Sequence, residues 1–296
     1  MNDDGNRVVL DNAPRRAWPR SGLVVALASL VGLAAFFGPF LLTLAPRGDA
    51  DAAAHADDAP LIFAVLTCLS LVAMLVVVSD EVAGASRAKT VALLGVLVAI
   101  DASLRLLPSF LGASPIFPLI ILVGAVFGPT MGFQMGTLTL LLSALLTGGI
   151  GPWLPFQMIV SGWVGLSAGW LPHCRSERMR VGVLTVFGAV WGLLFGVLMN
   201  LWFWPFSAPG VEADVGLYWT PGLSFVETVT RYGRFYLVTS LAFDAFRAVG
   251  NVVLMVVLGA SVLRLLERYR RRFAWEPWQA VPAMTTDDAP GRAVPR

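Results

Sequence analysis

Two pairs of oppositely charged residues stand inside long apolar stretches of the sequence: Asp101 with Arg105, and Asp244 with Arg247. A spacing of three or four residues places each pair on one face of a helix, where the two charges can neutralise each other. An ionisable side chain in a bilayer costs roughly 2.5–3.5 kcal/mol on insertion scales and often marks a functional site. These residues therefore indicate either structural ion pairs or a polar site within a membrane.

Aromatic and amide side chains gather in the segment 147–158, TGGIGPWLPFQM. Its glycines and prolines break helical structure and let a ligand approach the backbone closely. Trp153 and Phe156 offer flat apolar surfaces, and Gln157 offers an amide donor and acceptor. The segment fits either a ligand-binding loop or an interfacial turn that carries an aromatic belt residue.

Two later segments carry polar residues at helical spacing. In one, two glycines are followed by an amide and an indole at four-residue intervals; in the other, four polar residues share one helical face. Each pattern fits either a helix-packing surface or the wall of a ligand pocket. The residues are Gly192, Gly196, Asn200 and Trp204 in the first segment, and Ser240, Asp244, Arg247 and Asn251 in the second.

The elements that position these residues must be membrane helices. Hydrophobic residues make up 57% of the 296 residues and charged residues only 14%, against about 25% in soluble domains. Segments 106–174 and 181–211 contain no Asp, Glu, Lys or Arg. A span needs roughly 20 apolar residues, and its backbone must satisfy its own hydrogen bonds. We predict an all-α integral membrane protein with spans at 22–44, 61–79, 90–107, 116–127, 130–146, 156–171, 181–203 and 236–263.

Composition and motifs exclude several classes of protein. The high apolar content excludes a soluble enzyme and a disordered chain, and a net charge of +2 is too small for a nucleic-acid-binding surface. The sequence has no phosphate-binding loop, HExxH, CxxC or nucleophile elbow. His55 and His173 fall in loops on opposite sides of the predicted membrane. We therefore predict that the chain is no enzyme and binds no metal or cofactor.

The basic residues predict the orientation. If the N-terminus is cytoplasmic, all but five of the 21 Lys and Arg residues lie inside, as the positive-inside rule requires. Both termini are then cytoplasmic. The predicted organisation is a tail (1–21), two additional helices (22–86), a six-helix core (87–272) and a disordered tail (273–296). The first span could instead be a signal peptide, although its apolar run is longer than usual.

A ridge of small residues runs along the first helix of the core, formed by Ala92, Gly95, Ala99 and Ser103. Small residues let helix backbones approach closely in lipid, where apolar side chains supply no driving force for association. The ridge serves either packing within the chain or docking of another membrane subunit.

Taken together, residues 88–272 resemble the substrate-binding membrane subunit, or S component, of energy-coupling factor (ECF) transporters, which import vitamins into bacteria. The resemblance rests on Ala92, Gly95 and Ala99, the uncharged spans 116–146, the segment 148–158, the NLWFWP segment 200–205, and the stripe of Asp244, Arg247 and Asn251. The segments around Trp153 and Asn200 look most like the cobalamin-type branch.

The resemblance implies a six-helix core in the bacterial cell membrane, with a pocket that opens outside beneath loops 108–115 and 148–155. It also implies that the small-residue ridge docks on a partner transmembrane (T) subunit driven by two cytoplasmic ATPases. We expect Trp153, Gln157, Asn200 and Arg247 around one cavity. The full set of substrate-binding candidates is Arg105, Trp153, Phe156, Gln157, Asn200, Trp204, Asp244, Arg247 and Asn251.

Two other functions fit the sequence. A stand-alone secondary transporter normally needs ion-coupling carboxylates, and here Asp101 and Asp244 each have an arginine nearby. A membrane assembly protein without a ligand is the other alternative.

Overall fold

The computed structural model describes residues 20–42, 65, 85–106, 114–151, 153–172, 174, 176–204, 216–219 and 223–273, and no strand occurs among them. The predicted all-helical architecture is confirmed. The helices are α1 (Arg20–Leu42), α3 (Ala85–Leu104), α4 (Ile116–Phe127), α5 (Pro129–Thr147), α6 (Leu154–Ala168), α7 (Glu177–Phe203), α8 (Phe225–Thr239) and α9 (Leu241–Phe273).

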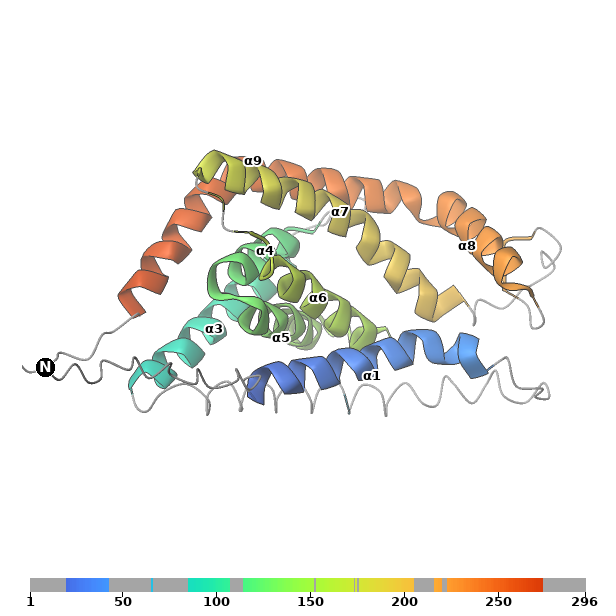
Figure 1. The fold of residues 1–296 in the computed structure, drawn as a ribbon, viewed down its shortest axis with the longest axis horizontal. Helices are drawn as coiled ribbons and strands as arrows, with labels where there is room; N and C mark the ends of the chain where they lie inside the picture. Colours follow the sequence, from blue (N-terminus) through green and yellow to red (C-terminus); the bar gives the residue numbers. More distant parts are fainter. Residues whose placement is uncertain are drawn as a thin grey trace, which may run out of the picture.

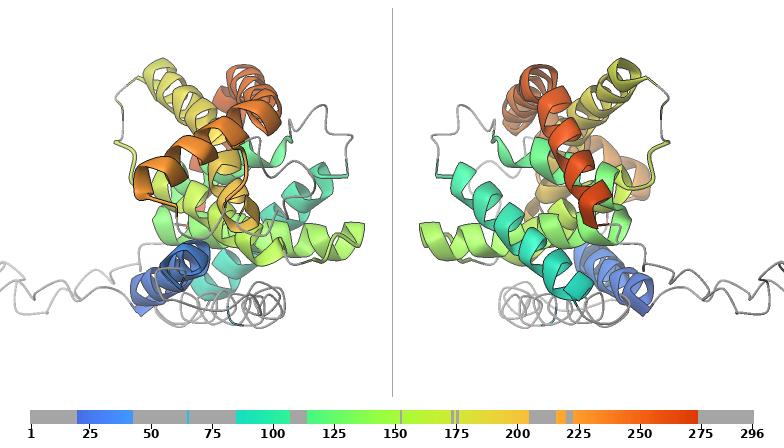
Figure 2. Two further views of the ribbon diagram at one scale, coloured as in Figure 1. Left: turned by 90° about the vertical axis from the view of Figure 1, so that its right-hand side faces the viewer. Right: turned by 90° about the vertical axis from the view of Figure 1, so that its left-hand side faces the viewer.

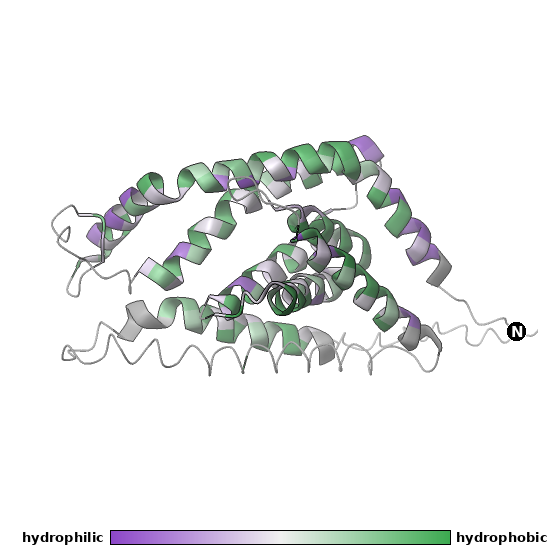
Figure 3. Cartoon of the chain, turned by 180° about the vertical axis from the view of Figure 1, so that it is seen from behind, coloured by the Kyte–Doolittle hydropathy of each residue, from purple (hydrophilic) through white to green (hydrophobic). Residues whose placement is uncertain are grey.

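The long helices α7 and α9 pack along each other on one side of the molecule, and α1 lies on the opposite side (Figure 1). Helices α4, α5 and α6 occupy the middle and α3 packs against α5, as the end-on views show (Figure 2). Hydrophobic residues dominate the long helices, whereas hydrophilic residues gather along α8 and the C-terminal part of α9 (Figure 3). The buried core therefore centres on α4, α5 and α6.

Among the described residues, three helices are long and apolar enough to cross a membrane: Pro129–Thr147, Glu177–Phe203 and Leu241–Arg271. The predicted span 116–127 coincides with α4, and most other predicted ends differ from the helix ends by a few residues. The predicted span 61–79 lies outside the described residues apart from residue 65, as do most of both tails. The count of eight spans therefore stays a prediction.

One predicted loop is wrong. The predicted spans 181–203 and 236–263 leave residues 205–235 as a loop, yet this segment contains most of α8, and only Ser240 separates α8 from α9. The last membrane helix begins at Leu241 rather than at 236, and it continues through the basic cluster to Phe273. Polar residues such as Glu227, Arg231 and Arg234 lower the mean hydropathy of α8, so the sequence of this amphipathic helix does not predict a membrane span.

Glycines set the spacing of the central helices. A side chain on Gly132 would overlap the backbone carbonyl of Gly165, and one on Gly136 would overlap that of Ser161. Helices α5 and α6 therefore touch backbone to backbone along two turns. The turn from α4 to α5 depends on Gly128, whose φ of 99° is a left-handed conformation that other residues rarely adopt.

Arginines meet the end of α4. This helix has 12 residues and spans about 18 Å, against roughly 30 Å of hydrocarbon in a bilayer. Arg180 donates to the Ala125 carbonyl at 2.9 Å, and Arg270 donates to the Val126 carbonyl at 2.8 Å. Arg180 also pairs with Glu267. We call this side of the molecule, where α4 and α9 end and α7 begins, the basic end.

The glycine contacts predict a strong contrast between two helices. Gly165→Ala should lower the free energy of unfolding of the purified protein by about 1–3 kcal/mol, and with it the melting temperature, because the added methyl group must separate α5 from α6. Gly95→Ala is the matched control, since a side chain there meets nothing within 4 Å. Equal melting temperatures for both variants and the unsubstituted protein would contradict the close α5–α6 packing.

Cysteine labelling tests the orientation. Ser176 and Ser224 precede α7 and α8 and lie on opposite sides of the predicted membrane. In a chain with Cys68→Ser and Cys174→Ser, Ser224→Cys should react with an impermeant thiol reagent added to intact cells. Ser176→Cys should react only after the cells are permeabilised. The reverse pattern would show that the positive-inside count gives the wrong orientation.

Candidate functional site

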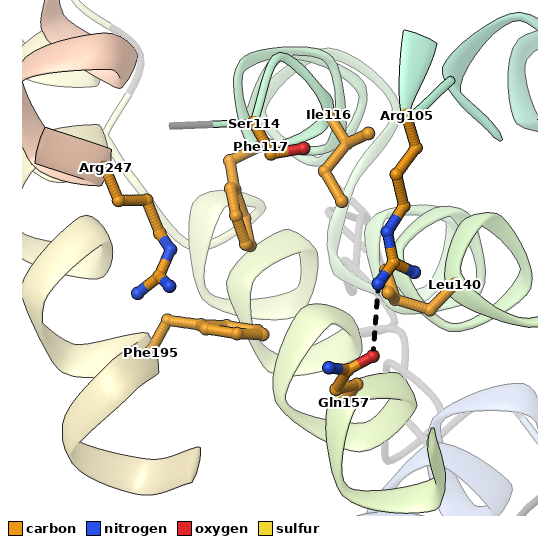
Figure 4. A pocket seen from close by; sticks show the side chains of 8 residues that line it. All are labelled: Arg105, Ser114, Ile116, Phe117, Leu140, Gln157, Phe195 and Arg247. Atoms are coloured by element: carbon orange, nitrogen blue, oxygen red, sulfur yellow. Dashed lines mark hydrogen bonds between the residues drawn. The ribbon is translucent and has the colours of Figure 1, made fainter. Parts of the chain in front are cut away.

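A cavity of about 230 Å3 lies between α3, α4, α5, α6, α7 and α9. Its lining comes from the end of α3, the starts of α4, α6 and α9, and the later halves of α5 and α7, so it lies away from the basic end. Two arginines enter it from opposite sides, with two phenylalanine rings between them (Figure 4). The lining residues are Arg105, Ser114, Ile116, Phe117, Leu140, Gln157, Phe195 and Arg247.

Arg105 follows the last turn of α3 and forms one wall of the cavity. Its guanidinium donates to the Ser143 hydroxyl at 3.2 Å and to the Gln157 Oε1 at 3.5 Å (Figure 4). Both acceptors are neutral, and both distances are long for a charge-assisted hydrogen bond. The two contacts orient the guanidinium without neutralising it.

Arg105 does not pair with Asp101, contrary to the pairing that their spacing suggested. Asp101 is fully buried, and within the described residues neither of its carboxylate oxygens has a hydrogen-bond partner. α3 packs against α5, and the hydroxyl of Ser143 lies within reach of Arg105, so the guanidinium is drawn across to α5. The carboxylate lies one helical turn away along α3.

Arg247 forms the facing wall, and it is neutralised. Its guanidinium pairs with Asp244 one turn earlier on α9 and donates to the Gly192 carbonyl at 3.3 Å. It also lies over the ring of Phe195, 5.1 Å from the centroid, in a cation–π arrangement. The predicted Asp244–Arg247 pair is therefore present, and three contacts hold the arginine at the rim of the cavity.

The glycine ridge of α7 receives the polar stripe of α9. The carboxylate of Asp244 occupies the space where Gly196 lacks a side chain, and Ala248 packs on Gly192 in the same way. One turn further on, the fully buried Asn251 donates to the Gly188 carbonyl at 2.9 Å. Asp244 and Asn251 thus serve helix packing here, and neither of them lines the cavity.

The predicted aromatic residues hold other contacts. Phe156 stacks on Trp202 with ring centroids 5.0 Å apart and meets Phe36 of α1 edge to face. Trp153 is 42% exposed, and its ring covers Gly151. Neither Trp153 nor Phe156 is among the residues that line this cavity, whereas Gln157, on the next position of α6, does line it.

Trp204 and Asn200 lie at the far end of α7. Trp204 is buried, donates from Nε1 to the Leu217 carbonyl at 2.9 Å and packs edge to face on Tyr232 of α8. It therefore ties the end of α7 to α8. The buried Nδ2 of Asn200 has no hydrogen-bond partner in the part of the chain that the structure describes, and Asn200 too is absent from the lining of this cavity.

Four residues of the cavity were not predicted: Ile116, Phe117, Leu140 and Phe195. Phe117 and Phe195 meet edge to face with centroids 4.9 Å apart and separate the two arginines. In the sequence they look like any apolar residue of a membrane span, so neither spacing nor composition distinguishes them. Ser114, in the segment predicted as a pocket loop, has a buried hydroxyl that finds no partner among the described residues.

The small-residue ridge of α3 faces outward. Ala92, Gly95, Ala99 and Ser103 are all exposed, whereas Leu97 and Val98 face the core. Beside the ridge, an apolar groove of about 430 Å3 runs between α3 and the last turns of α9, lined by Ala92, Val96, Ile100, Leu265 and others. Packing within the described part of the chain therefore does not use the ridge.

Residues 89–259 match the family described as "ECF transporter, substrate-specific component". The match covers more than half of the chain. The chain belongs to this family. Comparisons of this chain with curated proteins and with solved structures give no match.

Membership settles the general class of function. S components are transporter components and not enzymes; they work with T and ATPase subunits and with a small-molecule substrate. Within the described residues, no group of three or more His, Cys, Asp or Glu side chains could hold a metal ion. The family match begins at residue 89, within α3, and the predicted boundary at 87 stays a prediction.

The ion pair beside the cavity predicts a large effect on stability. Asp244→Ala should destabilise the S component by about 3–5 kcal/mol, because Arg247 would remain charged and unpaired. The combined change Asp244→Leu with Arg247→Met should recover most of that loss. Glu227→Ala, in the exposed pair with Arg231 on α8, is the control and should cost under about 1 kcal/mol. Equal melting temperatures for Asp244→Ala and Glu227→Ala would contradict this role.

Proposed function

We propose that this S component captures a vitamin-like micronutrient in the cavity between Arg105 and Arg247 and delivers it to an ATP-driven importer. The observation that carries the proposal is the convergence of six helices on a cavity with apolar walls and a few polar groups, which is the usual composition of a small-ligand site. The family match to a substrate-specific component supports the same assignment.

The proposed orientation places the cavity in the outer half of the bacterial cell membrane, with both termini in the cytoplasm. The basic end then faces the cytoplasm, in agreement with the distribution of Lys and Arg. The substrate enters from outside, and the ATPases act from the opposite side. The proposed organisation keeps the two N-terminal helices and the C-terminal tail expected from the sequence; residues 66–84 and 274–296 lie outside the described residues.

Cobalamin was the first candidate from the sequence resemblance. The cavity volume of about 230 Å3 lies below the roughly 300–1,000 Å3 that is typical of drug-sized ligand pockets. A corrinoid ring is far larger than such a space. The cavity therefore favours a compact vitamin, and we keep cobalamin as an alternative substrate.

We further propose that the exposed ridge of Ala92, Gly95, Ala99 and Ser103 docks on the T subunit. Four small residues along one exposed face allow a partner helix to approach the backbone of α3 closely. The adjoining apolar groove between α3 and α9 enlarges the surface on which the partner would lie.

Two substitutions should separate capture from docking. Ala99→Trp should abolish co-purification with the T and ATPase subunits and leave ligand binding intact, because the indole would hold a partner backbone away from α3. Gln157→Ala should weaken binding of the co-purified small molecule by roughly 5- to 150-fold and leave the complex intact, because a buried hydrogen bond is lost. Mass spectrometry of the purified complex measures both the subunits and the ligand.

Val190→Trp is the control for docking, since Val190 is an exposed residue of α7 away from the ridge. It should leave both the complex and the ligand unchanged. A complex that survives Ala99→Trp would refute the docking surface. Ligand binding that is unaffected by Gln157→Ala in a folded protein would remove the cavity from the proposed site.

A further inference from the structure

We infer that the substrate carries one anionic group, a carboxylate or a phosphate, which Arg105 binds. The inference deepens the proposed function, because it assumes that the cavity between Arg105 and Arg247 is the substrate site. It specifies which wall of the cavity binds the charge and which walls bind the rest of the molecule.

The charge balance of the cavity is the first argument. Among the described residues, its lining contains two guanidinium groups and no carboxylate. Arg247 already pairs with Asp244, and that carboxylate lies outside the lining. Arg105 makes no ion pair within the described residues, and its two acceptors, Ser143 and Gln157, are neutral. Asp101, one turn earlier on α3, is buried and makes no contact with Arg105 within the described residues. The cavity therefore presents one guanidinium that no direct contact neutralises, and an anionic ligand would supply that contact.

The remaining donors of Arg105 are the second argument. A guanidinium has five N–H groups in a planar fork. The two described hydrogen bonds of Arg105, at 3.2 and 3.5 Å, use two of these groups. The fork is therefore oriented while donors remain for a ligand. Two parallel hydrogen bonds from such a fork match the oxygen spacing of a carboxylate or a phosphate.

The other walls suit a compact, mainly apolar body. Phe117 and Phe195 supply two aromatic faces, with Ile116 and Leu140 beside them. Ser114 adds a buried hydroxyl that has no partner in the described part of the chain and would bind a second polar group of the ligand. Arg247 lies over the Phe195 ring and pairs with Asp244. It therefore forms the far wall of the cavity, and the ligand needs no second negative charge to neutralise it.

Matched pairs of probes test the inference on the purified full-length chain. Three pairs compare a carboxylate with its neutral counterpart: nicotinate with nicotinamide, pantothenate with panthenol, and biotin with biotinamide. A fourth pair compares pyridoxal 5′-phosphate with pyridoxal. Calorimetry at probe concentrations up to the millimolar range gives the affinity of each member.

In at least one pair, the anionic member should bind about tenfold or more tightly than the neutral one. Arg105→Gln should reduce that preference to less than about threefold, and Arg105→Lys should retain part of it, because an ammonium keeps the charge without the fork. Arg264→Gln removes the same charge at an exposed position on the basic end and should change nothing. The wild-type preference and the Arg105→Lys result remain informative if Arg105→Gln does not fold.

The inference is overturned if neutral members bind as tightly as anionic ones, if Arg105→Gln keeps the preference, or if no anionic probe binds. The proposed function has a separate readout. A chain that binds a neutral probe and co-purifies with T and ATPase subunits keeps the function and loses the inference. A chain that recruits neither subunit and binds no small molecule loses both.

Discussion

Close contact between helix backbones is the constraint on which the rest of this structure depends. In lipid, burying one apolar side chain against another gains little, so helices associate where small residues let their backbones meet. The Gly132–Gly165 contact brings α5 onto α6, and the glycine ridge of α7 receives Asp244, Ala248 and Asn251 of α9. The cavity lies between these two tightly packed pairs.

The polar groups of the membrane domain divide into two kinds. Asp244 and Asn251 fit into spaces left by glycines of α7. Asp244 pairs with Arg247 of its own helix and Asn251 donates to the Gly188 carbonyl of α7, so their cost in a bilayer is offset by packing and hydrogen bonds. Arg105 has contacts that fix its position but do not neutralise its charge. A polar residue in a membrane helix is thus more informative about a ligand when its contacts leave its charge uncompensated.

Much of the helical architecture follows from the sequence. The span 116–127 is bounded by Pro115 and Gly128, which interrupt the helix, and its predicted ends agree with α4. Helix α8 could not be recognised as part of the fold, since its polar residues resemble those of a loop. The prediction of Gln157 and Arg247 used their polarity within apolar spans, and both line the cavity. Phe117 and Phe195 carry no such signal, because only the three-dimensional arrangement distinguishes a cavity wall from a lipid-facing ring.

The contacts at the end of α4 bear on how the protein is made. Gly128 alone joins α4 to α5, so a ribosome delivers both helices to the membrane as one hairpin. The arginines that bind the last carbonyls of α4 come later in synthesis: Arg180 lies 55 residues after Ala125, and Arg270 lies 144 residues after Val126. When α4 has been synthesised, α7 and α9, which carry these two arginines, have not yet been made. The last carbonyls of α4 therefore lack these two partners during translation. Maturation of the central bundle is completed only when the C-terminal helix has been released and has closed onto it.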